Sequence, residues 1–145
     1  MNRETTPPLE FVPPRYQLRT KTWKQLEHMA TRLFSEYIRR KDADPMGNVN
    51  CFTCHRIDHW TNMHCGHYAS RKNMSTKFME INNHVQCPIC NITHDGNLSN
   101  YKKNLNKTYG AGTAEYIEEL ARKSYKYMRC DLIDLILDLE KKLGK

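Results

Sequence analysis

The strongest pattern along the chain is a set of apolar residues at helical spacing that begins just after residue 20. The set recurs every three or four positions and comprises Trp23, Leu26, Ala30, Leu33, Phe34, Tyr37 and Ile38. Thr22 and Gln25 have the spacing of a capping box, in which each side chain bonds the other residue's backbone. Pro45 limits the far end, because the residue before a proline resists helical geometry. We therefore predict an N-terminal helix within residues 17–45.

The apolar pattern is weaker on both sides of this helix. Residues 1–16 contain four of the six prolines and few residues that could pack, so we expect a flexible N-terminal arm. Residues 46–70 predict short strands and turns. The stretch KFMEI at 77–81 is a further strand candidate.

Helical spacing returns in the second half of the chain. Pro88 suits the first position of a helix, which is either continuous or broken near Gly96. Two further helical segments, at about 113–127 and 130–143, make up a C-terminal helical region of residues 113–145. The last segment has a broad apolar face, which either packs on the core or forms a homodimer contact. Both interpretations stay open from the sequence.

The charge balance favours a polyanionic partner. The formal net charge is +7, and a basic protein of this size most often binds nucleic acid or an anionic membrane. No stretch approaches the ~20 apolar residues that span a bilayer, and no basic amphipathic helix has a bulky apolar face. DNA is therefore the expected partner, with no membrane. The N-terminus lacks the apolar core of a signal peptide, so we expect a cytoplasmic protein; a secreted one whose signal has been removed is the alternative.

Four of the six cysteines form two C-x-x-C pairs. These are Cys51 with Cys54 and Cys87 with Cys90. In a reducing cytosol such pairs indicate a tetrahedral zinc site, and four thiolates leave no open position for water or substrate. The zinc would therefore be structural. A redox dithiol needs only one pair and a thioredoxin-like context, which the sequence lacks.

The segment between and after the cysteine pairs carries candidates for phosphodiester hydrolysis. That reaction needs a base for water, a divalent cation on the scissile phosphate and a rigid frame. His67 would lie at the end of one strand and Asn82 at the end of the next. Asn91 directly follows the last cysteine. His94, three residues on, would share about the same helix face, so both are candidate ligands for the catalytic divalent ion.

Several motifs together resemble the NinG/Rap recombination endonucleases of lambdoid phages. They are WKQLEHMATRLFSEYIRRKDAD followed by CFTC, then GHYASR, NNHVQCPICN and GNLSNY. The similarity covers roughly residues 17–120. It implies an α+β fold with a ββα-metal (His-Me finger, HNH-type) nuclease core at 46–112, stapled by the zinc site and flanked by N- and C-terminal helices. It also implies cleavage of branched DNA, such as Holliday junctions and D-loops, with Mg²⁺ or Mn²⁺, in the bacterial host cytoplasm.

The resemblance assigns roles to individual residues. His67 matches the general base, Asn82 the asparagine that steadies the active-site loop, and Asn91 a metal ligand on the helix. Related junction resolvases place an aspartate directly before the catalytic histidine, whereas this chain has Gly66. Position 64 projects to the same side of a strand as position 66, so His64 is our candidate for the missing ligand. A histidine ligand favours softer divalent ions, so Mn²⁺ is expected to work at least as well as Mg²⁺.

Basic and hydroxyl side chains flank the candidate catalytic residues. The candidate DNA contacts are Ser70, Arg71, Lys72, Lys77, Lys102, Lys103 and Lys107. Tyr101 and Tyr109 are interleaved with them and could stack on unpaired bases. No base-reading pattern is present, which favours recognition of DNA shape.

Three functions are weighed on these residues. The first is a structure-specific DNA endonuclease. The second is a non-catalytic zinc module that binds DNA or a replication partner, and the third is a sequence-specific HNH nuclease. The set of His67, Asn82 and Asn91 favours a nuclease, because a binding module has no need of it.

Overall fold

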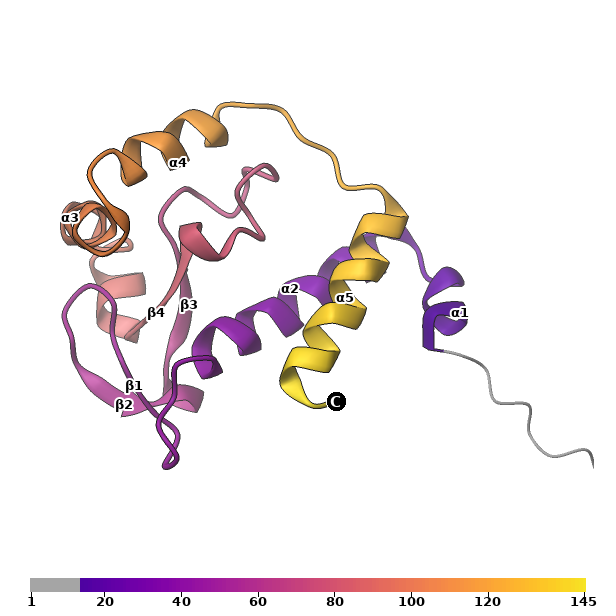
Figure 1. Ribbon diagram of the computed structural model, residues 1–145, viewed down its shortest axis with the longest axis horizontal. Coiled ribbons are helices and arrows are strands. Elements are labelled where there is room, and N and C mark those ends of the chain that lie inside the picture. Colours follow the sequence, from indigo (N-terminus) through magenta and orange to yellow (C-terminus); the bar gives the residue numbers. More distant parts are fainter. Residues whose placement is uncertain (1–13) are drawn as a thin grey trace, which may run out of the picture.

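Two long helices, α2 and α5, cross on one side of the molecule (Figure 1). The structure is a computed structural model and describes residues 14–145. α2 spans Trp23–Arg40 and α5 spans Arg129–Leu143. The predicted capping box of α2 is confirmed: the Gln25 N–H donates to Thr22 Oγ1 at 3.2 Å, and the Thr22 N–H donates to Gln25 Oε1 at 2.9 Å.

The apolar faces of α2 and α5 form the largest hydrophobic core. Its fully or nearly fully buried members are Leu18, Leu26, Ala30, Leu33, Phe34, Ile38, Leu132, Ile133, Ile136 and Leu139. Each large aliphatic side chain buried in this way stabilises the fold by roughly 1.5–3 kcal/mol. The apolar face of the last helix therefore packs within the chain, which is the first of the two interpretations of that face.

The N-terminal boundary differs from the prediction. Residues 1–13 of the expected arm lie outside the described residues. The next residues are helical, because α1 spans Pro14–Arg19 and Pro14 suits a first helical position. Leu18 anchors α1 to the α2–α5 core, and Arg15 forms an ion pair with Asp134 of α5 at 2.6 Å.

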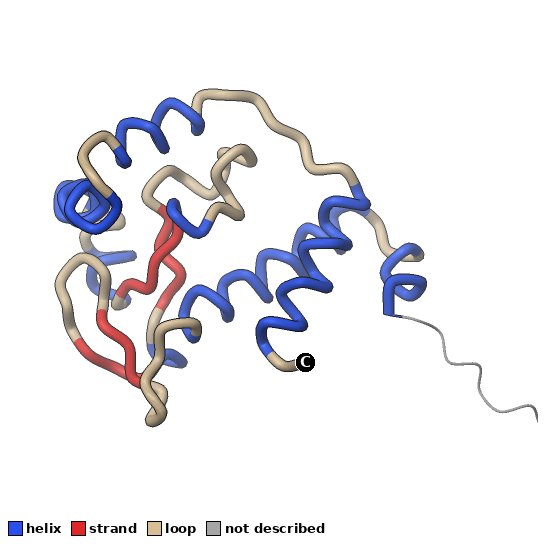
Figure 2. The backbone as a smooth tube through the Cα atoms, viewed as in Figure 1, coloured by secondary structure: helices blue, strands red, loops and turns tan. Residues whose placement is uncertain are grey.

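Two small antiparallel sheets lie beside the helices (Figure 2). In the first, β1 (Asn48–Asn50) pairs with β2 (Ile57–His59). In the second, β3 (His64–His67) pairs with β4 (Asn83–Gln86), with His67 opposite Asn83 and His64 opposite Gln86. The chain is thus α+β, as predicted, with two strands in each sheet.

The predicted strand at 77–81 is wrong. This stretch runs through successive turns and a 3-10 turn at Glu80–Asn82, and β4 begins one residue later. The Asn83 side chain donates to the Lys77 and Met79 carbonyls at 3.1 and 2.7 Å, so those carbonyls do not face a neighbouring strand. Phe78 instead packs on Phe34 of α2, with ring centroids 5.6 Å apart.

The segment after β4 is helical but broken, which is one of the two forms that the sequence allowed. A π-helical turn at Ile89–Thr93 is followed by three left-handed residues, Asp95, Gly96 and Asn97, with φ of 47°, 89° and 48°. Two α-helices follow, α3 (Leu98–Tyr109) and α4 (Thr113–Ala121). The helix expected at 113–127 ends at Ala121, and a non-helical connector crosses the molecule to α5 (Figure 1).

Another cluster of buried side chains, separate from the α2–α5 core, packs α3 against the β3–β4 sheet. Tyr101 of α3 is fully buried, and its hydroxyl donates to the Gly66 carbonyl at 2.8 Å. His84 of β4 stacks on Phe52 and forms hydrogen bonds with the hydroxyls of Tyr101 and Tyr109 at 3.0 and 2.7 Å.

Among the described residues no helix combines the length and the apolar character that crossing a membrane requires.

Candidate metal centre and catalytic cavity

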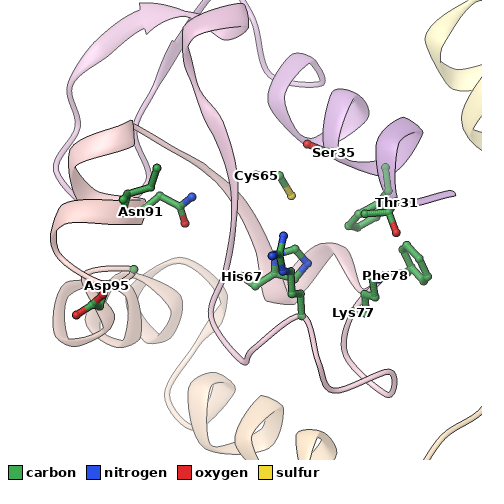
Figure 3. A pocket seen from close by; sticks show the side chains of 12 residues that line it. Thr31, Ser35, Cys65, His67, Lys77, Phe78, Asn91 and Asp95 are labelled. Carbon is green, nitrogen blue, oxygen red and sulfur yellow. The ribbon is translucent and has the colours of Figure 1, made fainter. Parts of the chain in front are cut away.

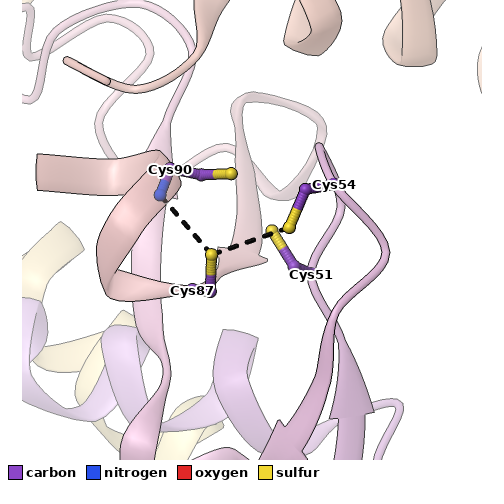
Figure 4. Close-up of side chains that lie close together, drawn as sticks. All are labelled: Cys51, Cys54, Cys87 and Cys90. Carbon is purple, nitrogen blue, oxygen red and sulfur yellow. Dashed lines mark hydrogen bonds between the residues drawn. The ribbon is translucent and has the colours of Figure 1, made fainter. Parts of the chain in front are cut away.

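The two C-x-x-C pairs meet at one point, as their spacing predicted (Figure 4). The four sulfur atoms of Cys51, Cys54, Cys87 and Cys90 all lie within 4.8 Å of one another. One pair follows β1, and the other begins directly after β4 and ends in the π-helical turn. A metal ion held here would connect the two sheets to that turn.

The surroundings of the sulfur atoms fit thiolate ligands. The Cys90 N–H donates to Cys87 Sγ at 3.4 Å, the Asn97 amide donates to Cys90 Sγ at 3.5 Å, and the Thr53 hydroxyl lies 3.3 Å from Cys51 Sγ. Burial raises the pKa of Cys54 and of Cys87. Burial acts to raise the pKa of Cys51, but hydrogen bonds from Thr53 and from backbone N–H groups outweigh it and lower that pKa to about 6. Such donors stabilise metal-bound thiolates, so the cluster could hold a metal ion such as zinc.

A separate cavity of about 530 Å³ lies beside β3 (Figure 3). Four segments contribute its polar side chains. They are β3 with His67, the π-helical turn and the residues after it with Asn91 and Asp95, α2 with Thr31 and Ser35, and the loop before β4 with Arg71 and Lys77. The cavity therefore brings together residues from four segments that are distant in the sequence.

His67 ends β3 and faces this cavity, in the position along the strand that the sequence predicted. Burial lowers its pKa to about 4, and the nearby charges of Lys77 and Arg71 act in the same direction. At neutral pH the imidazole is consequently uncharged. That is the form in which a histidine can accept a proton.

Asn82 holds the loop that follows His67. The Ala69 N–H donates to its side-chain oxygen at 2.7 Å, and its amide donates to the Ala69 and Thr76 carbonyls at 3.1 and 3.2 Å. The residue is fully buried. It lies just before β4 rather than at the end of a strand, and its side chain connects both ends of the loop of residues 69–76.

The structure brings together two of the three candidate ligands for a divalent ion. The Asn91 amide lies 3.0 Å from His64 Nδ1, across the gap between the π-helical turn and β3. His94 lies elsewhere. It borders a hollow lined by Cys54, Cys87 and Cys90, on the side of the cysteine cluster, and it does not line the cavity of His67.

One family model, described as the bacteriophage lambda NinG protein, matches residues 15–145. The chain belongs to the NinG family. The resemblance carried by GHYASR and NNHVQCPICN is thereby confirmed, and the match extends beyond residues 17–120 to include α5. NinG membership indicates a role related to phage recombination. Neither the curated proteins nor the solved structures contain a match to the chain.

The candidate DNA contacts of this NinG-family chain divide into two groups. Lys77 is buried and paired with Glu27 of α2, and Lys102 pairs with Glu115 and Glu118 of α4 at 3.3 and 3.4 Å. Both charges are therefore paired with carboxylates of the protein itself. The exposed group is Ser70, Arg71, Lys72, Lys103 and Lys107. Tyr101 is fully buried, so the base stacking suggested for it is wrong, while the side chain of Tyr109 stays exposed.

Sequence reasoning missed several residues that line the NinG cavity. Thr31 and Ser35 come from α2, and Asp95 occupies a left-handed turn. Thr31 and Ser35 continue a polar series at every fourth position of α2, beside the apolar face, and that spacing is a signal that the sequence contains. Asp95 has the weaker signal of preceding Gly96, because aspartate tolerates left-handed turns.

Proposed function

We propose that this protein is a metal-dependent DNA endonuclease that hydrolyses phosphodiester bonds in branched DNA during phage recombination. The observation that carries the proposal is a single cavity lined by a neutral His67, by Asn91 and by the exposed Arg71. Membership of the NinG family supports it, because the role is related to recombination.

The order of elements around the cavity supports a ββα-metal core. β3 and β4 pair as an antiparallel unit, and the helical turn that bears Asn91 follows β4 directly. Cys87 and Cys90 lie at that junction, so a zinc ion bound by the four cysteines would fix the turn relative to the sheet.

In this mechanism His67 accepts the proton of the attacking water at a ring nitrogen. An incoming phosphate would raise the pKa of His67 from about 4 towards the working pH, since an anion stabilises the imidazolium. Arg71 binds a phosphate oxygen and orients the strand. Asn91 and His64 would hold Mg²⁺ or Mn²⁺, which supplies charge stabilisation at the phosphate and the leaving oxygen.

Junction cleavage tests this proposal. A labelled four-way junction and a linear duplex of matched length are incubated with the protein in Mg²⁺, Mn²⁺ or EDTA. We expect metal-dependent nicking of the junction, and a loss of at least about a hundredfold in rate for His67→Ala. His28→Ala is the matched control, because His28 is exposed on α2 and does not line the cavity.

Two other outcomes would replace the proposal. A folded protein that binds the junction and never cuts it would be a non-catalytic zinc module. Preferential cleavage at one site in linear duplex would indicate a sequence-specific HNH nuclease. Equal cleavage by His67→Ala and wild type would remove the catalytic assignment.

A further inference from the structure

α2 carries a row of polar side chains next to its apolar face, and two of its four members line the cavity. Its members follow one another at every fourth position, so they lie on one side of the helix: Glu27, Thr31, Ser35 and Arg39. Thr31 and Ser35 line the cavity, and Glu27 pairs with Lys77 from the opposite loop. The negative charge of Glu27 is thus neutralised within the protein.

Arg39 ends this row with an unpaired positive charge. Its Nε donates to the Ser35 carbonyl at 3.2 Å, and its guanidinium carbon lies 5.3 Å from the centre of the Trp60 ring. Within residues 14–145 no carboxylate lies at ion-pair distance from Arg39. The neighbouring Arg40, by contrast, pairs with Glu36 at 2.8 Å. The terminal N–H groups of Arg39 are consequently available to an anion.

Arg39 lies beside the cavity without lining it. It follows Ser35, which lines the cavity, by one helical turn, and it is joined to Ser35 by the hydrogen bond to that residue's carbonyl. Arg71, which lines the cavity from the loop before β4, is exposed, and no carboxylate of the described chain pairs with it. One unpaired guanidinium group therefore lines the cavity of His67, and a second, that of Arg39, belongs to the residue one helical turn beyond Ser35.

We propose that Ser35 and Arg39, which we name the α2 wall, bind the phosphodiester backbone of the DNA substrate beside His67. Thr31 is not part of the α2 wall, because its hydroxyl donates to the Glu27 carbonyl at 2.8 Å. Hydroxyl and guanidinium groups are the usual protein contacts of phosphate oxygens, and they carry no base specificity. Trp60 is a positioning residue: the guanidinium carbons of Arg39 and Arg40 lie 5.3 and 5.2 Å from the centre of its ring, and this cation–π contact orients Arg39. This inference rests on the proposed function, because it takes the substrate of the cavity to be DNA.

The inference is tested by binding without cleavage. Anisotropy of a labelled four-way junction is measured without added Mg²⁺ or Mn²⁺ and without a chelator, so that the zinc site stays intact, over a series of NaCl concentrations. Arg39→Ala should weaken binding about tenfold and reduce the slope of log K against log salt by about 0.9, the loss of one phosphate contact. Arg32→Ala is the matched control. Arg32 is exposed on the same helix, and its substitution removes the same positive charge. Equal binding by the two variants would overturn the α2 wall.

A second pair of variants separates Trp60 from a purely structural role. Trp60→Phe should keep the affinity and the salt slope, because it keeps an aromatic ring under Arg39. Trp60→Leu should lower both towards the Arg39→Ala values. Melting curves of all variants establish that they are folded. The same affinity and the same salt slope for Trp60→Leu and Trp60→Phe would show that the aromatic ring does not position Arg39.

The two proposals fail in different ways. Junction binding that depends on Arg39, without any cleavage in Mg²⁺ or Mn²⁺, would keep the α2 wall and refute the nuclease. Cleavage that depends on His67, with binding indifferent to Arg39, would do the reverse. Absence of junction binding by the wild type would overturn both.

Discussion

Replacing Gly66 by alanine should destabilise the protein through the side chain of Gln86. Gly66 is buried in β3, directly before His67. A Cβ at this position would lie 2.6 Å from Cδ and 2.8 Å from Cγ of Gln86, and closer still to its side-chain oxygen. Gln86 is fully buried, and its amide donates to Thr53 Oγ1 at 3.0 Å and to the Gly96 carbonyl at 2.9 Å.

The magnitude follows from these two hydrogen bonds. Moving Gln86 away from a new methyl group breaks both, at about 1 kcal/mol each, and leaves buried partners that cost about 1–3 kcal/mol more when unsatisfied. We therefore expect Gly66→Ala to lower the free energy of unfolding by about 3–5 kcal/mol. A domain of this kind has only ~5–15 kcal/mol in total. An aspartate at position 66 would meet the same atoms of Gln86, so the packing around Gly66 leaves no room for one.

Urea denaturation measures the effect, and a double-mutant cycle assigns it. In a Gln86→Ala background the methyl group has room, so Gly66→Ala should cost less than about 1 kcal/mol there. Because the hydroxyl of Thr53 also touches Cys51 Sγ at 3.3 Å, Gly66→Ala should release zinc more readily, by roughly tenfold in affinity. An unfolding free energy within about 0.5 kcal/mol of wild type would refute the reasoning.

Three further predictions concern the metal, pH and the buried ion pair. Metal analysis should find one zinc per chain, and a chelator should lower the melting temperature; a protein that holds no metal and melts unchanged would exclude a structural ion. Burial lowers the pKa of His67 to about 4 and of His84 to about 3, from an ordinary 6.5. The unfolded chain therefore binds protons that the native state excludes as pH falls below about 6.5, so stability should decrease towards pH 4 and be independent of these groups above pH 7. This loss of stability between pH 7 and pH 4, followed as the midpoint of denaturant unfolding, should be smaller in His84→Gln. An equal loss in His84→Gln and wild type would show that the burial of His84 does not cause it. Glu27→Ala should lower the free energy of unfolding by about 3 kcal/mol, because it leaves the buried Lys77 unpaired. The double variant Glu27→Ala with Lys77→Met should lower it by less. Equal unfolding free energies for the wild type and Glu27→Ala would show that the ion pair does not stabilise the fold.

The sequence alone determined the features that depend on local spacing. The capping box at Thr22 and the apolar face of α2 follow from positions three and four residues apart, and both are found in the structure. The C-x-x-C pairs identified the four cysteines that meet, because a tetrahedral site imposes its own spacing on each pair. The family resemblance was readable for the same reason, since it rests on short continuous motifs.

Only the tertiary structure decided which polar residues face the cavity. KFMEI has the composition of a strand, but the side chain of Asn83 and the packing of Phe78 on α2 make it a series of turns. Lys77 and Tyr101 have the residue types of DNA contacts, yet an ion pair and a buried hydroxyl network occupy them. Burial and pairing are set by segments distant in the sequence, and local spacing contains no information about which segments those are.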